Sequence, residues 1–300
     1  MRLSNGFAYC KLAAMDKTQD KGQRAVQSAE VGARLLLALA GRPGAMSLKD
    51  LAAAADMPPS RAHPYLVSFS RLELIAQDTG SGHYALGPAA LQLGLTYLHQ
   101  LDPVKAATPV AEELAQRTGY AVALAVWGNF GATIVRMIDA RQPLHVSMRA
   151  GTVMSLLGTA TGRAFAAVLP LERIERTLAS PLGDPDQAGR PLSAAQRTEL
   201  QDAVEEWRAH GVARANGRPM PGVNAFSAAA LDHEGQPAIV VTALGHQDHF
   251  PAQWDSAAAR AVRTAAAEVS RRLGWPGQAA APPAPAVAAR TATSRAAGRR

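Results

Sequence analysis

The fold is decided by residues 47–71, which read SLKDLAAAADMPPSRAHPYLVSFSR. Ser47 is a good helix N-cap, and the helix that it opens is interrupted by the Asp-Met-Pro-Pro sequence of residues 56–59. A second helix is expected over Ser60–Arg71. The apolar residues that share one face of these helices are Leu48, Leu51 and Ala55, followed by Ala62, Leu66 and Phe69. The pattern predicts two short helices joined by a tight turn.

The flanking sequence adds a helix before this pair and a hairpin after it. Ser28 is expected to cap the first helix, which ends in the glycine- and proline-rich segment 41–44. The inward positions of that helix are Val31, Leu35 and Leu39. Two strand-like runs, Leu74–Gln77 and His83–Leu86, flank the turn-forming residues 78–82. Three short helices followed by a hairpin predict a winged helix-turn-helix DNA-binding domain over residues 25–87.

The second helix of such a pair lies in the major groove of double-stranded DNA and presents its outward side chains to the bases and phosphates. The side chains expected to contact DNA from this helix are Ser60, Arg61, His63, Pro64, Tyr65, Ser68 and Arg71. The hairpin turn adds Ser81 and His83. The alternative is a helical bundle whose polar face only contacts solvent.

A linker helix is expected over residues 88–102, with Leu91, Leu95 and Leu98 at helical spacing. A helix of this length is not stable alone, so its apolar face is expected to contact a partner. Asp102-Pro103 is a strong start for the next helix, which Thr118-Gly119 ends.

Residues 103–275 mix strands and helices. The expected strands are Ala121–Trp127, Ala132–Asp139, His145–Arg149, Asn224–Leu231 and Pro237–Leu244. The expected helices are Thr161–Leu169, Leu171–Ala179, one opened by a capping box at Ser193–Gln196, and a closing helix over Pro251–Leu273. Several hairpins beside helices predict an α+β domain with an antiparallel sheet.

Charge separates the ends of the chain from its middle. The net charge of +7 divides into +3 for residues 1–100, zero for 101–275 and +4 for 276–300, which suits a DNA-binding front end and a neutral body that binds a small ligand. We expect disorder in the polar arm 1–24, where Met15 is an alternative start, and in the Ala-, Pro- and Arg-rich tail 276–300. Cys10 is the only cysteine, no apolar run is long enough to span a membrane, and no secretory signal is evident, so a cytoplasmic location is expected.

The chain resembles the IclR family of transcriptional regulators over roughly residues 25–275. The resemblance is carried by residues 47–52, 60–63 and 83–87 in the first part and by residues 151–153, 156–157, 159–164, 221–224 and 232–235 in the second. It implies a GAF-like effector domain, a homodimer or a dimer of dimers, and control by a small organic acid or aromatic metabolite. One departure is Pro64, where the family usually has arginine, since a proline inside a helix costs about 3 kcal/mol or more.

The resemblance also implies an effector pocket, formed by Gly158, Thr159, Ala160, Asn224, Ala225, Thr242 and Leu244. The N–H groups at the helix start that follows Gly158–Ala160 suit an anion. Thr159, Thr242 and Asn224 are expected to donate hydrogen bonds to the effector. Ala225 and Leu244 replace polar residues of some relatives, which favours an aromatic or otherwise partly apolar carboxylate.

Enzymatic alternatives find little support in the sequence. The His246-Gln247-Asp248-His249 segment is expected to be solvated surface rather than a metal site, and Ser155 and Ser227 lack the G-x-S-x-G frame of a serine hydrolase. No Walker lysine follows the glycines of 158–162. We therefore expect no catalytic residue, no metal and no cofactor. A metabolic enzyme or a ligand-binding module without DNA recognition remains the alternative to a regulator.

Overall fold

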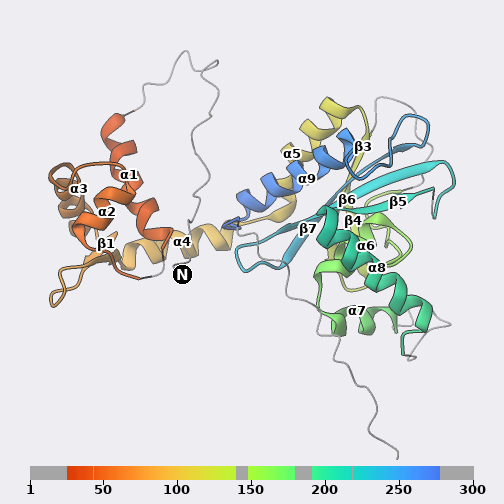
Figure 1. Ribbon diagram of the computed structural model, residues 1–300, viewed down its shortest axis with the longest axis horizontal. Coiled ribbons are helices and arrows are strands. Elements are labelled where there is room, and N and C mark those ends of the chain that lie inside the picture. Colours follow the sequence, from red (N-terminus) through yellow and green to blue (C-terminus); the bar gives the residue numbers. More distant parts are fainter. Residues whose placement is uncertain (1–25, 43, 140–147, 180–190, 218, 278–300) are drawn as a thin grey trace, which may run out of the picture. The chain divides into compact units, whose positions relative to one another are not determined.

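The computed structural model describes residues 26–42, 44–139, 148–179, 191–217 and 219–277 (Figure 1). They belong to two compact units that divide between Gln100 and Leu101. The expected arm 1–24 and residues 278–300 of the expected tail lie outside the described residues. Most of the expected strand His145–Arg149 also lies outside them, and its described residues, Met148 and Arg149, are not in a strand.

The first unit has the predicted winged helix-turn-helix order. Its elements are α1 (Gln27–Ala40), α2 (Leu48–Ala54), α3 (Pro59–Arg71), β1 (Ile75–Gln77), β2 (Tyr84–Leu86) and α4 (Pro88–Gln100). Ser47 caps α2 as predicted, its hydroxyl accepting the Asp50 N–H at 3.2 Å. The prediction for Ser28 was wrong, because α1 begins at Gln27 and its N-cap residue is Val26, whose side chain has no oxygen to accept a hydrogen bond.

The core of this unit holds α3 tightly against its neighbours. Leu35, Leu51, Ala62 and Leu66 are fully buried in it. Gly32 lets α1 approach α3 closely, since a Cβ atom at this position would lie 2.8 Å from the ring of Phe69. The buried core thus fixes the side of α3 opposite to its exposed face.

The hairpin is bonded to the segment that precedes α2. Met46 and Tyr84 exchange two backbone hydrogen bonds of 2.8 Å, so residue 46 extends the β1–β2 ladder by one bridge. These bonds attach the hairpin to the helical part of the unit.

Helix α4 buries none of its residues. Its exposed side chains include Leu91 (63%), Leu93 (64%) and Leu95 (45%), whereas Leu98 is half-buried. The apolar character expected of the linker helix is therefore present, and it faces solvent in the single chain.

The second unit is built on a five-stranded antiparallel sheet of order β4-β3-β7-β6-β5. The strands are β3 (Ala121–Gly128), β4 (Gly131–Ile138), β5 (Ala213–Asn216), β6 (Val223–Leu231) and β7 (Pro237–His246). The predicted α+β class with an antiparallel sheet is confirmed. Strand β5 was not predicted, because its four residues are too few to show an alternating pattern.

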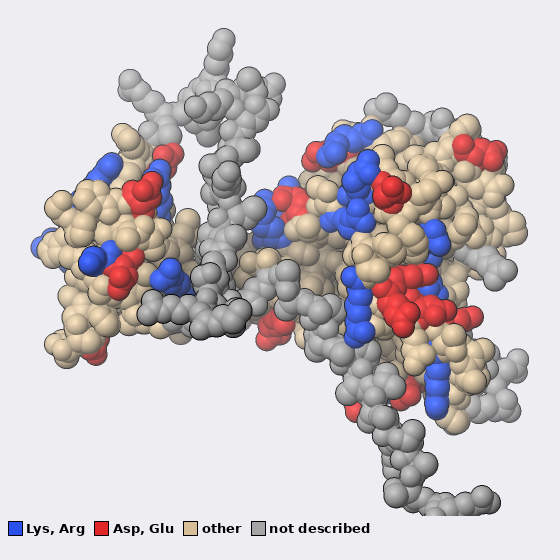
Figure 2. Space-filling view, in the orientation of Figure 1, with Lys and Arg blue, Asp and Glu red and all other residues tan. Residues whose placement is uncertain are grey.

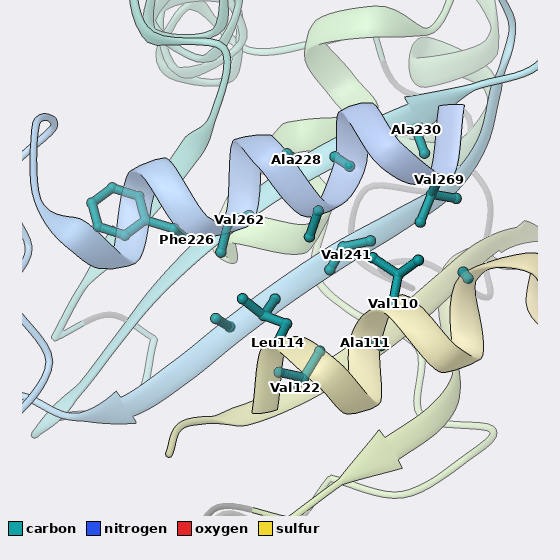
Figure 3. Close-up of a cluster of buried hydrophobic side chains, with 14 of the residues drawn as sticks. Val110, Ala111, Leu114, Val122, Phe226, Ala228, Ala230, Val241, Val262 and Val269 are labelled. Atoms are coloured by element: carbon teal, nitrogen blue, oxygen red, sulfur yellow. The ribbon is translucent and has the colours of Figure 1, made fainter. Parts of the chain in front are cut away.

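Helices cover both faces of this sheet. On one face α5 (Pro103–Thr118) and α9 (Ala257–Arg272) pack on Val122, Phe226 and Val241 (Figure 3). On the other face the helices are α6 (Ala160–Val168) and α8 (Ala194–His210), with α7 (Leu171–Leu178) beside them. Because neighbouring strand residues point to opposite faces, each strand contributes alternate residues to the two cores.

In the second unit the predicted caps of α5 and α8 are confirmed, and the predicted start of α9 is wrong. Asp102 caps α5, Gly119 ends it in the left-handed conformation, and Ser193 forms the expected capping box with Gln196. The closing helix was expected from Pro251 but begins at Ala257. Its N-cap is Ser256, whose hydroxyl accepts the Ala259 N–H at 3.2 Å, and residues 251–256 form a loop before it.

Candidate nucleic-acid interface and ligand site

The side chains expected to contact DNA lie on the outer surface of α3 and of the hairpin turn. The exposed members of the set are Ser60, Arg61, His63, Pro64, Ser68, Arg71, Ser81 and His83. Tyr65 is half-buried, and its ring lies 3.1 Å from the position that a Cβ atom on Gly32 would occupy. Tyr65 thus packs α3 against α1 as well as bordering the exposed face.

Pro64 lies inside α3, as expected, at the sixth position of the helix. It has no N–H for the carbonyl of Ser60, which is exposed and can bond to water instead. The helix continues to Arg71, and the Ser68 hydroxyl donates to the Pro64 carbonyl at 3.0 Å. The Ser68 donor is therefore already used within α3.

The hairpin turn is closed by a carboxylate that was not expected to have a role. Oδ1 of Asp78 accepts both the hydroxyl and the backbone N–H of Ser81 at 2.7 Å. The hydroxyl and then the backbone bond of Ser81 lower the pKa of Asp78, which is fully exposed. The hydroxyl donor of Ser81 is therefore already used within the turn. The Asp-x-x-Ser spacing of residues 78–81 is a turn motif that would have revealed this.

A cavity of about 360 Å³ lies between α3 and the hairpin. It is lined by His63 and Arg71 of α3 and by Gln77 and Tyr84 of the hairpin, among others. The fold thus brings together basic and amide side chains from segments that are separate in the sequence. Gln77 was missed, although it is the last residue before the turn.

The described part of the first unit does not carry the positive charge that was expected of a DNA-binding front end. Residues 26–100 hold five Lys/Arg and five Asp/Glu, so the excess of +3 over residues 1–100 comes from residues 1–25. Charges of both signs are scattered over the α1–α3 region of the face shown in Figure 2. The described residues of this unit therefore supply no net positive charge that would attract DNA.

In the second unit, the residues expected to bind the effector do not all lie on one face of the sheet. Ala225, Thr242 and Leu244 lie on the face covered by α6. Asn224 lies on the α9 face, where its amide donates to the Phe250 carbonyl at 3.0 Å and accepts the Gly217 N–H at 3.1 Å. Asn224 is 4% exposed and has a structural role, so the structure separates it from the other predicted residues.

A chain of three buried hydroxyl groups joins α6 to the sheet. Thr242 of β7 is hydrogen-bonded to Thr161 of α6 at 2.9 Å and to Ser227 of β6 at 2.8 Å. All three side chains are at most 3% exposed. Thr161 and Ser227 were not among the predicted site residues, although Ser227 follows Ala225 by two positions and so shares its face.

The start of α6 is capped by the chain itself. The Thr159 hydroxyl donates to the Ser155 carbonyl at 2.8 Å and accepts the Gly162 N–H at 3.0 Å. Gly158 is exposed, whereas Thr159 and Ala160 are buried. The first turn of α6 is thus less available to an anion than the sequence suggested, because one of its N–H groups is already bonded.

The other chemical candidates are surface features. Asp248 lies 3.3 Å from His246, and both side chains are at least half exposed. Among the described residues, no three His, Cys, Asp or Glu side chains are placed to hold a metal ion. No helix in the described ranges is long and apolar enough to cross a membrane.

A winged helix-turn-helix unit followed by an α/β sandwich domain defines a class of DNA-binding regulators with a separate ligand domain. The family model for the IclR helix-turn-helix domain matches residues 28–79. The model described as bacterial transcriptional regulator IclR C-terminal matches residues 95–271, more than half of the chain. The chain belongs to the IclR family of transcriptional regulators.

Individual relatives agree with this assignment. The glycerol operon regulatory protein of Streptomyces griseus is 30% identical over 84% of this chain and 98% of its own length, and that of Streptomyces coelicolor is 28% identical over 84% and 98%. The crystal structure of Pseudomonas aeruginosa HmgR is 37% identical and covers 84% of this chain and 100% of its own, with a TM-score of 0.75. Membership in this family makes the chain a DNA-binding transcriptional regulator.

Proposed function

We propose that this regulator binds operator DNA as a symmetric homodimer and that a small organic carboxylate changes its affinity for the operator. Residues 25–87 contact DNA, residues 88–102 link the units, and residues 103–275 bind the effector. Such a protein acts in the cytoplasm, where bacterial DNA is found. The observation that carries the proposal is the exposed polar face of α3 beside the hairpin, on a unit whose core lies behind it.

Helix α4 supports the dimer. Its exposed leucines, Leu91, Leu93 and Leu95, have no buried neighbour in their own helix, and a 13-residue helix is marginal without a packed face. Pairing with the α4 of a second copy covers Leu91 and Leu95, which share one side of the helix, and gives the assembly two α3 helices. The operator then has two half-sites whose centres are separated by about one helical turn or a multiple of it. Two such dimers assemble into a dimer of dimers where adjacent operators exist.

The effector site is assigned to the α6 face of the sheet. Ala225 and Leu244 supply apolar surface, and Thr242 and Thr159 supply hydroxyl groups. An aromatic or partly apolar carboxylate suits this combination. To bind, it has to replace bonds that Thr242 makes with Thr161 and Ser227, so binding alters the contact between α6 and the sheet. A ligand regulates only if it binds the DNA-competent and incompetent states with different affinity.

The DNA test is a gel shift and footprint on the sequence upstream of the protein's own gene, at increasing salt. We expect a two-half-site footprint and an affinity that falls steeply as salt rises. Leu91→Glu and Leu95→Glu should each weaken binding and shift the protein towards a monomer, whereas Thr96→Glu, a matched charge on the same helix, should do so less. Binding to a single half-site by a monomer would contradict the dimer.

The effector test is calorimetric titration of the full chain with aromatic and aliphatic acids. Thr242→Val should weaken the binding of the acid that binds wild type. Asn224→Ala is the control on the opposite face and should lower stability without changing the contacts of the effector. Equal affinity in wild type and Thr242→Val would place the site elsewhere, and turnover of the acid would contradict a purely regulatory role.

A further inference from the structure

A cavity of about 700 Å³ opens on the second unit away from the α6 face. It lies where the end of α8, the start of β5, the loop before α9 and α9 itself meet. Its polar and aromatic lining consists of His210, Arg214, Gln253, Trp254, Asp255 and Arg263. Trp254 packs against the core shared by α5 and α9, with its ring 5.9 Å from that of Phe226. The cavity therefore lies on the side of the sheet opposite to Thr242.

Two arginines are held rigidly in this cavity by backbone and aromatic contacts. Arg214 donates from Nη1 to the Ala252 carbonyl at 2.9 Å, and its guanidinium carbon lies 4.1 Å from the centre of the Trp254 ring. Arg263 donates from Nη1 to the carbonyls of His210 at 2.8 Å and Trp254 at 3.5 Å. Both arginines thus contact Trp254, which places two cations around one residue.

These two cations have no carboxylate partner within the described ranges of the chain, where the ion pairs involve other residues. The bonds to carbonyls use one nitrogen of each guanidinium, so Nε and Nη2 of both remain available as donors. These atoms are not among the buried side-chain nitrogens that lack a partner, so they reach the solvent of the cavity. Two half-buried arginines without a carboxylate partner thus line the same cavity.

The remaining groups leave the cavity positive. Asp255 is exposed and contributes one negative charge against the two guanidinium groups. His210 stacks on Trp254 at 4.2 Å and almost parallel to it, so its ring is fixed in the lining. Arg263 uses Nη1 to bond the His210 carbonyl at the end of α8. The position of the Arg214 guanidinium is accounted for by its contact with the Trp254 ring. Neither contact uses the donors that face the cavity.

We propose that this cavity is a second ligand site, distinct from the α6 face, which binds a small polyvalent oxyanion through Arg214 and Arg263. A carboxylate or phosphate group matches the planar donor pair of each guanidinium. Two fixed guanidiniums favour a ligand with two or more negative charges, either a di- or tricarboxylate or a phosphate. Because the donors are already oriented by carbonyls and by Trp254, little side-chain ordering is needed on binding.

The test is calorimetric titration of the full chain with citrate and with inorganic phosphate, at an ionic strength held constant with sodium chloride. We expect saturable binding of at least one of these anions, and we expect Arg214→Gln to weaken it by about tenfold to one hundredfold. Arg214→Lys, which keeps the charge but loses the planar fork, should bind with intermediate affinity. Thr242→Val should bind the anion as wild type does.

Arg136→Gln is the matched control, since Arg136 is exposed and paired with Glu112 outside the cavity. Thermal melts of every variant verify folding. Arg263→Lys tests the role of the second guanidinium in anion binding while it keeps a positive charge at the end of α8. The proposal is overturned if neither anion binds more tightly than chloride. It is also overturned if Arg214→Gln and Arg136→Gln, both folded, weaken binding equally.

Discussion

The two candidate sites of this regulator differ in how their side chains are occupied. On α3, Arg61, His63 and Arg71 are exposed on a helix whose other side is fixed by the core. On the α6 face, Thr159 and Thr242 are buried and already bonded to other groups of the chain. The proposed DNA-binding surface is therefore formed before DNA arrives, whereas the proposed effector site must exchange internal hydrogen bonds for bonds to the ligand. On this proposal the regulator responds to the ligand in its second unit and keeps its DNA-contacting surface constant.

The largest effect on stability is expected from a side chain added at Gly162, near the start of α6. A Cβ on Gly162 would lie 2.1 Å from the Ser155 carbonyl oxygen and 2.5 Å from the Leu156 Cα, both backbone atoms. We expect Gly162→Ala to lower the free energy of unfolding of the second unit by about 3 kcal/mol, the upper end of the common cost of overpacking, because the atoms that it meets are backbone atoms. Thermal or urea unfolding of the full chain measures it.

Gly158→Ala is the control for this change. A Cβ at that position would meet only side-chain atoms of Ser155, the hydroxyl at 3.0 Å and the Cβ at 3.5 Å, and the hydroxyl can rotate away at the loss of its bond to the Gly158 N–H. Its effect should be well under that of Gly162→Ala. Equal melting temperatures for the two variants would show that α6 moves freely over the 155–156 backbone.

The next largest effect is expected from replacement of Pro64 in α3. Pro64→Arg restores a helical N–H for the Ser60 carbonyl and adds a cation to the exposed face. We expect a stability gain of at most about 3 kcal/mol and tighter operator binding with a steeper salt dependence. Unfolding curves and gel shifts measure the two effects. Pro59→Ala, at the first position of α3 where proline is tolerated, should change neither by much.

A smaller effect tests the hydroxyl chain itself. Thr242→Val removes the central member and leaves Thr161 and Ser227 buried without this partner, so we expect a loss of about 1–3 kcal/mol. Thr133→Val is a control on the edge strand β4, because its half-buried hydroxyl donates to the nearby Gly131 carbonyl and not to another strand or helix of the described residues. A loss no greater than that of the control would mean that the chain of hydroxyls does not hold α6 to the sheet.

The smallest effect concerns pH at the hairpin turn. The folded pKa of Asp78 lies below its usual value of 3.8, so its contribution is present above that value and is lost as pH falls through the folded pKa. We expect the Ser81 amide signal in NMR spectra to shift in this acidic range, and Asp78→Asn to abolish that titration. Spectra of Ser81 that do not change with acid would show that the carboxylate does not close the turn.

Most of the fold follows from local signals in the sequence. Ser193 was predicted as a cap because Gln196 stands three residues on, Ser47 because serine precedes the apolar positions of α2, and Gly119 and Gly211 end helices in the left-handed conformation. Ser28 has Val31 three residues on and caps nothing. The start of α9 was misplaced because the apolar spacing around Pro251 extends into a loop.

The sites were harder to predict, because their residues are brought together by the sheet register. Asn224 and Ala225 are neighbours in the sequence, so strand alternation alone sends them to opposite faces, yet both were assigned to one pocket from the resemblance. Ser227 follows the same alternation and was overlooked. The cavity around Trp254 joins α8, β5 and α9, and no spacing within one segment reveals such a meeting.

The two backbone bonds between Met46 and Tyr84 limit how this regulator can change its operator. They fix the hairpin to the segment before α2, and the core fixes α3 to the same helices, so the distance between the two contact points is constant. If α3 and the hairpin contact DNA as proposed, we expect a variant with a new preferred sequence to arise by exchange of surface side chains such as Arg61 or Ser60. Spacing between the major-groove contact and the wing contact should be inherited unchanged by all such variants.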